Sequence, residues 1–115
     1  MDIMPRSVPR TYSRHCREAA VLLGSLIRTA RKERGLAARE VAERAGISRG
    51  LLRRIEKGGL ECGIGAVFEV AVIVGVPLFE ADAAALPRHI RRTEDKLALL
   101  PQSIRKKDRP VDDDF

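Results

Sequence analysis

The sequence is poor in the residues that build metal sites, disulfide frameworks and membrane spans. Its 115 residues hold no Trp, one Tyr, three Phe, two Cys and two His. Cys16 and Cys62 are not part of a CxxC motif, so neither a zinc site nor a disulfide framework is expected. The longest apolar run, residues 70–79, contains Gly75 and Pro77 and is too short to cross a bilayer. We therefore expect a reduced, cytoplasmic protein that holds no metal and no cofactor.

The chain also lacks the motifs of catalysis. It has no Gly-rich phosphate-binding loop, and its Ser, Cys and His residues stand in no triad-like context. A chain of this length forms one domain, which leaves little room for a second, catalytic one. The expectation is a protein that is not an enzyme.

Charge, in contrast, is abundant and unevenly distributed. The 22 basic and 16 acidic residues give a net charge of +6, which favours a polyanionic partner. Residues 1–57 hold 14 basic and 6 acidic residues, whereas residues 58–87 hold four acidic residues and no basic one. Residues 88–109 are again basic, and residues 110–115 are acidic. This asymmetry is typical of a protein that meets phosphate on one face and protein on another.

Hydrophobic periodicity predicts an all-α fold in three parts. Residues 1–17 are expected to form a flexible basic arm, because they hold two Pro residues and too little apolar surface to offset the entropy of ordering. Residues 18–86 are expected to form the domain, and residues 87–115 a charged C-terminal helix and tail. Helices are predicted at residues 17–34, 38–45, 49–57, 64–74 and 78–85, with a further amphipathic helix at 88–100. Their inward-facing residues include Leu22, Leu26, Ile27, Val41, Ala42, Ile55, Val70, Ala71 and Val74.

Two of these predicted helices flank a tight turn that contains Gly46, a spacing typical of a helix-turn-helix. Ser48 is a suitable N-cap for the second of them, with its hydroxyl accepting from the backbone N–H of Gly50 or Leu51. Arg49 and Arg53 are four residues apart and share one face of that helix. Each guanidinium can donate two hydrogen bonds to a guanine.

The residue pattern also suggests roles for Gly50 and Arg54, which lie next to these two arginines. Gly50, between them, permits a close approach of the helix to another molecule. Arg54 is displaced by about 100° from Arg53. It is therefore either a phosphate contact or an ion-pair partner of Glu40 or Glu43.

The motif VAERAGIS at residues 41–48 is followed by RIEKG at residues 54–58. On these motifs, residues 22–80 resemble the Cro/repressor-like, or XRE, family of helix-turn-helix proteins. Further matching segments are residues 26–28, 31–36, 52–53, 70–71 and 74–78. The resemblance implies a five-helix, lambda-repressor-like domain that binds double-stranded DNA with its third helix in the major groove.

The same resemblance assigns roles to individual residues. Base reading falls on Arg49, Gly50 and Arg53, and contacts to the DNA backbone fall on Ser48 and Lys57. The family usually has Thr-Gln at the start of the second helix, where the Gln holds a phosphate, but this chain has Ala37-Ala38. Arg39 is the candidate replacement for that contact.

A dimer surface is predicted on the helix at residues 64–74. Phe68, Val72 and Ile73 are large apolar residues on its outer surface, and a repressor needs a two-fold partner to reach two half-sites. The alternative is that the fifth helix and the segment around residues 97–100 cover this surface within one chain.

The predicted domain is followed by a short, charged tail that contains Pro110 and ends in three Asp residues and Phe115. A single domain with such a tail resembles the HipB-type antitoxins, which bind HipA-type Ser/Thr kinase toxins. This resemblance implies a homodimeric repressor that controls its own toxin–antitoxin operon and binds the kinase. The candidate partner-binding residues are Asp112, Asp113, Asp114 and Phe115, and the alternative is a solubilising tail. A stand-alone XRE-type repressor of a phage or metabolic operon, or an interaction module that no longer reads DNA, are the other functions considered. The N-terminal arm is either a DNA contact or dispensable.

Overall fold

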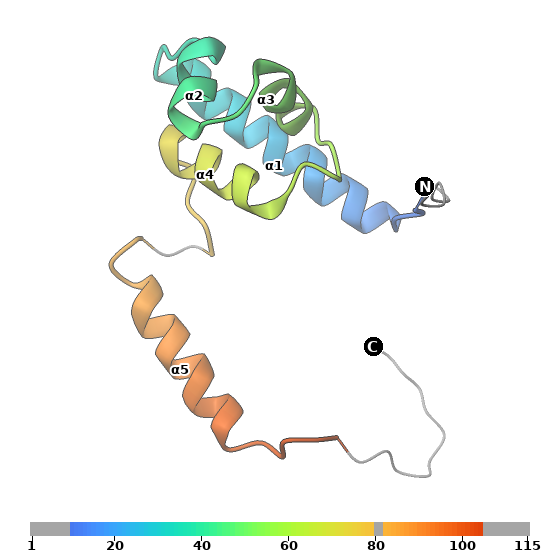
Figure 1. Cartoon of the computed structure of the whole chain (residues 1–115), viewed down its shortest axis with the longest axis vertical. Coiled ribbons are helices and arrows are strands. Elements are labelled where there is room, and N and C mark those ends of the chain that lie inside the picture. Colours follow the sequence, from blue (N-terminus) through green and yellow to red (C-terminus); the bar gives the residue numbers. More distant parts are fainter. Residues whose placement is uncertain (1–9, 80–81, 105–115) are drawn as a thin grey trace, which may run out of the picture. The chain divides into compact units, whose positions relative to one another are not determined.

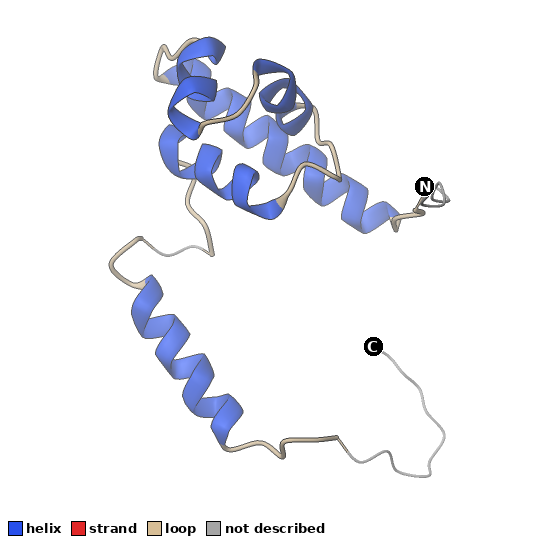
Figure 2. Ribbon diagram, viewed as in Figure 1, coloured by secondary structure: helices blue, strands red, loops and turns tan. Residues whose placement is uncertain are grey.

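The chain contains five helices and no strand within the residues that the computed structural model describes, 10–79 and 82–104 (Figures 1 and 2). The helices are α1 (Arg14–Glu33), α2 (Ala38–Ala45), α3 (Arg49–Glu56), α4 (Ile64–Val74) and α5 (Leu86–Ala98). The chain divides into two units, Met1–Glu80 with α1 to α4 and Ala81–Phe115 with α5. The predicted all-α fold is confirmed. No helix of the described part has the length and apolarity needed to cross a membrane.

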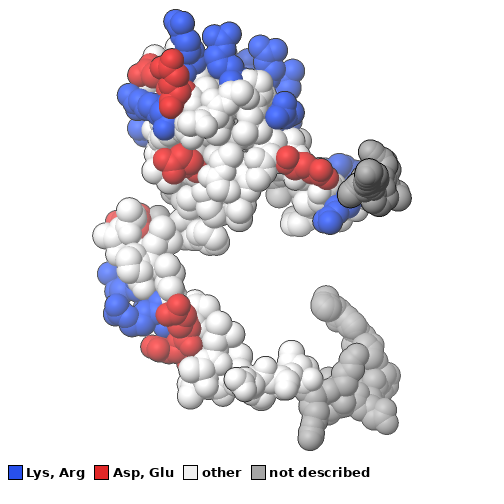
Figure 3. All heavy atoms as spheres, viewed as in Figure 1, with Lys and Arg blue, Asp and Glu red and all other residues white. Residues whose placement is uncertain are grey.

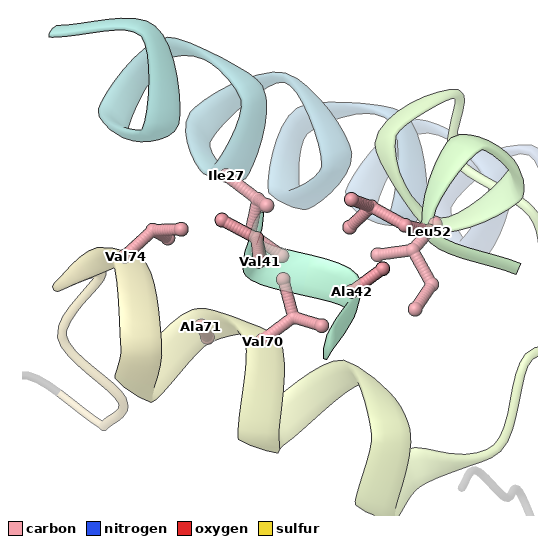
Figure 4. Close-up of a cluster of buried hydrophobic side chains, with 8 residues drawn as sticks. Ile27, Val41, Ala42, Leu52, Val70, Ala71 and Val74 are labelled. Atoms are coloured by element: carbon pink, nitrogen blue, oxygen red, sulfur yellow. The ribbon is translucent and has the colours of Figure 1, made fainter. Parts of the chain in front are cut away.

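The core of the first unit lies between α1, α2, α3 and α4 (Figure 4). Its predicted members Ile27, Val41 and Val70 are completely buried. Leu22 and Leu26, which were expected to widen the apolar face of α1, are instead 60% and 47% exposed. The reason is that α1 packs against α3 and α4 on one side, so that its other side is left to solvent. The fully assembled core consists of Ile27, Val41, Ala42, Leu52, Ile55, Val70, Ala71 and Val74.

The first helix begins earlier than predicted. Ser13 caps α1, because its hydroxyl accepts a hydrogen bond of 3.1 Å from the backbone N–H of Cys16. Residues 14–17 are therefore helical, and the prediction of a flexible arm was wrong for them. Just before the cap, the Tyr12 hydroxyl donates to a carboxylate oxygen of Glu61 at 3.0 Å, and this hydrogen bond raises the pKa of Tyr12. Residues 1–9 of the predicted arm lie outside the described residues.

The predicted fifth helix of the domain is not formed. Residues 78–79 and 82–85 are turn or irregular structure, and α5 starts only at Leu86. Phe79 has a φ of 59°, a left-handed conformation that stops helix growth from the Pro77 side. Pro87 lies in the first turn of α5, where its missing N–H has no partner to lose. The helix predicted at residues 88–100 corresponds to α5.

A close backbone contact joins α1 to the end of α3 at Gly24, which is buried. A Cβ atom at this position would lie 2.5 Å from the carbonyl oxygen of Ile55 and 2.8 Å from that of Glu56. The last turn of α3 thus rests directly on the backbone of α1. Only glycine allows this distance.

Replacing Gly24 with Ala tests that contact. Helix propensity alone predicts a gain of about 0.5–1 kcal/mol from this change. The contact predicts the opposite, a loss of about 1–3 kcal/mol in the free energy of unfolding, because backbone atoms must move to admit the methyl group. The measurement is chemical denaturation followed by circular dichroism.

Gly65→Ala is the matched control for this experiment. Gly65 also lies in a helix, α4, but apart from its chain neighbours and the nearby backbone of α4, no described residue has an atom within 4 Å of a Cβ built on it. Its replacement is expected to leave stability unchanged or to raise it by up to about 1 kcal/mol. A Gly24→Ala protein as stable as the Gly65→Ala protein would contradict the proposed role of the contact.

Candidate nucleic-acid interface

Helices α2 and α3 form a helix-turn-helix with the predicted local signals. Gly46 ends α2 in a left-handed conformation, with a φ of 72°. The Ser48 hydroxyl caps α3 by accepting a hydrogen bond of 3.0 Å from the backbone N–H of Leu51. Leu52 and Ile55 anchor α3 in the core. The opposite face of α3 is consequently held outward.

A groove of about 690 Å³ runs along α3 and is bordered by α1 and by the start of α2. We call it the basic groove, because six basic residues and one acidic residue line it. Figure 3 shows Lys and Arg side chains along the edge of the first unit that α2 and α3 form. The residues that line the groove are Arg28, Arg31, Ala37, Ala38, Arg39, Arg49, Leu52, Arg53, Glu56 and Lys57.

The basic groove brings together four of the residues predicted to contact DNA. They are Arg39, Arg49, Arg53 and Lys57, and all four are exposed. Within the described part of the chain, none of these four side chains forms an ion pair or a hydrogen bond. Their charges are therefore available to an external anion.

Three further predicted residues lie on or beside α3 without lining the groove. Ser48 and Gly50 are exposed at its N-terminal end. Arg54 is exposed and forms no ion pair with Glu40 in the structure, because Glu40 pairs with Arg44 at 3.2 Å. A guanidinium nitrogen of Arg54 instead lies 3.9 Å from the position that a Cβ of Gly50 would occupy. This is an ordinary van der Waals distance, so a Cβ at position 50 would not displace the Arg54 guanidinium.

Ala37 leaves the start of α2 without a side-chain cap. The first backbone N–H groups of α2 are thus left for solvent or for a ligand. Arg39, on the first turn of α2, lines the same end of the groove. The placement is compatible with its predicted contact to a phosphate.

The sequence interpretation missed an ion pair that joins α1 to α3. Arg31 donates to both carboxylate oxygens of Glu56, at 2.7 and 3.0 Å, and to the carbonyl oxygen of Leu36 at 3.0 Å. The side chains of Arg31 and Glu56 are only 12% and 8% exposed. The hydrogen bonds to Glu56 raise the pKa of Arg31, so the guanidinium stays charged. A sequence signal existed, because each residue lies four positions beyond a core residue, Ile27 or Leu52, on the inward face of its helix.

The exposed apolar residues on and next to α4 differ in part from those predicted for the dimer surface. Val72 is 62% exposed, and Phe68 is half-buried on the same side of α4 with its ring edge-on to Phe79 at 6.3 Å. Ile64, which the sequence interpretation overlooked, is 71% exposed and lies two turns before Val72. Ile73 packs against the core and lies on another side of α4. We call Ile64, Phe68, Val72 and Phe79 the apolar stripe.

The residues proposed for partner binding are not placed by the structure. Asp112, Asp113, Asp114 and Phe115 all lie outside the described residues. The resemblance to HipB-type antitoxins therefore gains no structural argument from them.

Comparison with known proteins agrees with the geometry of α1 to α4. A family model described as a helix-turn-helix domain matches residues 22–86, more than half of the chain. No curated protein matches the chain. The matched region contains α2, the turn, α3 and α4, together with every residue that lines the basic groove. The chain thus belongs to the helix-turn-helix domain family, in agreement with its resemblance to the XRE-like DNA-binding proteins.

Proposed function

We propose that the protein is a sequence-specific DNA-binding transcriptional repressor. The observation that carries this proposal is the basic groove, in which cationic side chains from three helices converge and, among the residues that the structure describes, only Arg31 has an acidic partner. Like charges placed this closely repel one another, and a bound polyanion removes that repulsion. The phosphate backbone of DNA is such a polyanion.

Base reading is assigned to the exposed face of α3. Arg49 and Arg53 lie one turn apart on this face and project from a helix that the core holds firmly. In the major groove of DNA, each guanidinium can bind O6 and N7 of a guanine. Arg39 and Lys57, at the edges of the groove, are assigned to phosphates. These contacts position the protein but carry no sequence information.

Replacing Arg49 or Arg53 with Ala is expected to reduce discrimination between the preferred duplex and a scrambled duplex by about 10- to 100-fold. The reason is that each change removes a bidentate contact to a base. Fluorescence anisotropy with duplexes chosen by selection from a random library measures both affinities. Arg44→Ala, which removes an exposed arginine outside the groove, is the matched control. Equal affinity of the wild-type protein for all duplexes would contradict sequence-specific recognition.

The apolar stripe, three residues of which lie on α4, is proposed as the homodimer surface. Monomeric proteins rarely expose several large apolar side chains side by side. None of the four residues of the stripe lines the basic groove, so this surface is separate from the charges of the groove. Two copies of α3 must also reach half-sites about 34 Å apart, which requires a two-fold partner.

Val72→Asp tests the dimer surface. The exposed position of Val72 allows the carboxylate to stay hydrated in a monomer, whereas a dimer interface would bury it. We expect sedimentation velocity to show a monomer. Operator affinity should be at least about 10-fold weaker, because the free-energy cost of burying the carboxylate in a dimer interface exceeds about 1.4 kcal/mol. Leu22→Asp, an equally exposed apolar position on α1, should leave the dimer intact. A Val72→Asp dimer as stable as the wild-type dimer would exclude this surface.

The finer proposal is that the repressor is the antitoxin and autoregulator of a toxin–antitoxin operon and binds a HipA-type kinase. Its support is the separate second unit, whose α5 exposes Ile90 and Leu97, with Leu100 exposed just beyond the helix. The alternative is a stand-alone XRE-type repressor of a phage or metabolic operon. Co-purification with a HipA-type kinase separates the two, and its loss on deletion of residues 110–115 would assign the tail.

A further inference from the structure

Arg28 belongs to α1 and lies outside the helix-turn-helix, yet it lines the basic groove together with residues of α2 and α3. Its side chain is exposed. It forms no ion pair or hydrogen bond with any other residue that the structure describes. Helix α1 therefore contributes a cationic wall to the groove, in addition to the basic residues of α2 and α3.

The base of this side chain is held firmly in place. Ile27, the preceding residue, is completely buried in the core. Arg31, one turn later on α1, is bound to Glu56 of α3 and to the carbonyl oxygen of Leu36. Between these two anchors, the backbone at Arg28 keeps a fixed position relative to α3. A long cationic side chain on a rigid base is suited to an anion at a constant distance from that helix.

We propose that Arg28 binds a backbone phosphate of the DNA whose bases α3 reads, so that α1 forms a second wall of the interface. Arginine suits this role, because its guanidinium can donate two parallel hydrogen bonds to phosphate oxygens. The lining of the groove also includes Ala37, Ala38 and Arg39 at the start of α2, and the two alanines are too small to fill it. The inference rests on the proposed DNA-binding function and adds a contact that is independent of sequence.

The salt dependence of DNA binding gives a quantitative test in the full-length chain. Loss of one phosphate contact lowers the slope of log K against log salt by about 0.9. The ratio of wild-type to Arg28→Ala affinity is therefore expected to fall about 3.5-fold between 50 and 200 mM salt. The preferred and the scrambled duplex should lose affinity by the same factor, which distinguishes Arg28 from a base-reading residue. Arg28→Lys should restore the wild-type slope, and Arg44→Ala should leave the slope unchanged.

A second measurement identifies the phosphate itself. The test uses a set of duplexes that each carry one neutral methylphosphonate in place of a phosphate. At one position, this change should weaken DNA binding by the wild-type protein and leave DNA binding by the Arg28→Ala protein unchanged. Thermal unfolding of the variant should match that of the wild type, since Arg28 is exposed and contacts no described polar group.

The possible failures are distinguishable. An Arg28→Ala protein with the wild-type salt slope and the wild-type response to every methylphosphonate overturns the inference. If Arg49→Ala and Arg53→Ala still lose sequence discrimination in that case, the proposed function survives and only the role of Arg28 falls. If the wild-type protein binds no duplex at all, both fall together.

Discussion

The placement of α3 against α1 is the constraint on which the rest of the first unit depends. Two contacts set it, the backbone approach at Gly24 and the ion pair between Arg31 and Glu56. The first contact sets the distance between the helices, and the second sets how α3 is rotated about its axis. A buried ion pair adds little net stability over an apolar pair, but an unpaired charge at either position is costly. The pair therefore adds little net stability but favours this placement of α3, because other placements would leave a charge unpaired.

The placement of α3 against α1 divides the basic residues of the first unit into one that is paired inside the fold and others that face the groove. Arg31 faces inward and has a partner, whereas Arg28, Arg49 and Arg53 remain unpaired among the described residues and converge on one groove. The excess of basic residues in the first half of the sequence thus becomes a local surface of positive charge. The acidic and apolar segment that follows contributes the stripe of α4, and α5 belongs to a unit of its own. The distribution matches a protein that occupies DNA on one surface and another polypeptide elsewhere.

Local chemistry explains which parts of this arrangement could be predicted from the sequence. Gly46 and Ser48 define the turn between α2 and α3 through their own backbone and hydroxyl, so both helices were predicted to within one residue. Four residues of the groove followed from the resemblance and the helical spacing. From the sequence alone, Gly24 only lowers the helix propensity of α1, and its role becomes clear only from the contact with α3. Ile73 cannot be assigned to a side of α4 without knowledge of its packing partners. Arg28 was missed because α1 joins the groove only in the folded chain.

Helix α1 holds α3 in place through the Arg31–Glu56 pair, and α3 thereby keeps its basic face outward. The most direct measurement is the free energy of unfolding of Glu56→Gln compared with Glu40→Gln, which weakens the exposed pair to Arg44. A loss of about 3 kcal/mol is expected for Glu56→Gln, because the partly buried guanidinium is left without a counter-charge. A loss below about 1 kcal/mol is expected for Glu40→Gln. Equal losses for the two variants would show that the Arg31–Glu56 pair does not hold α3 in place.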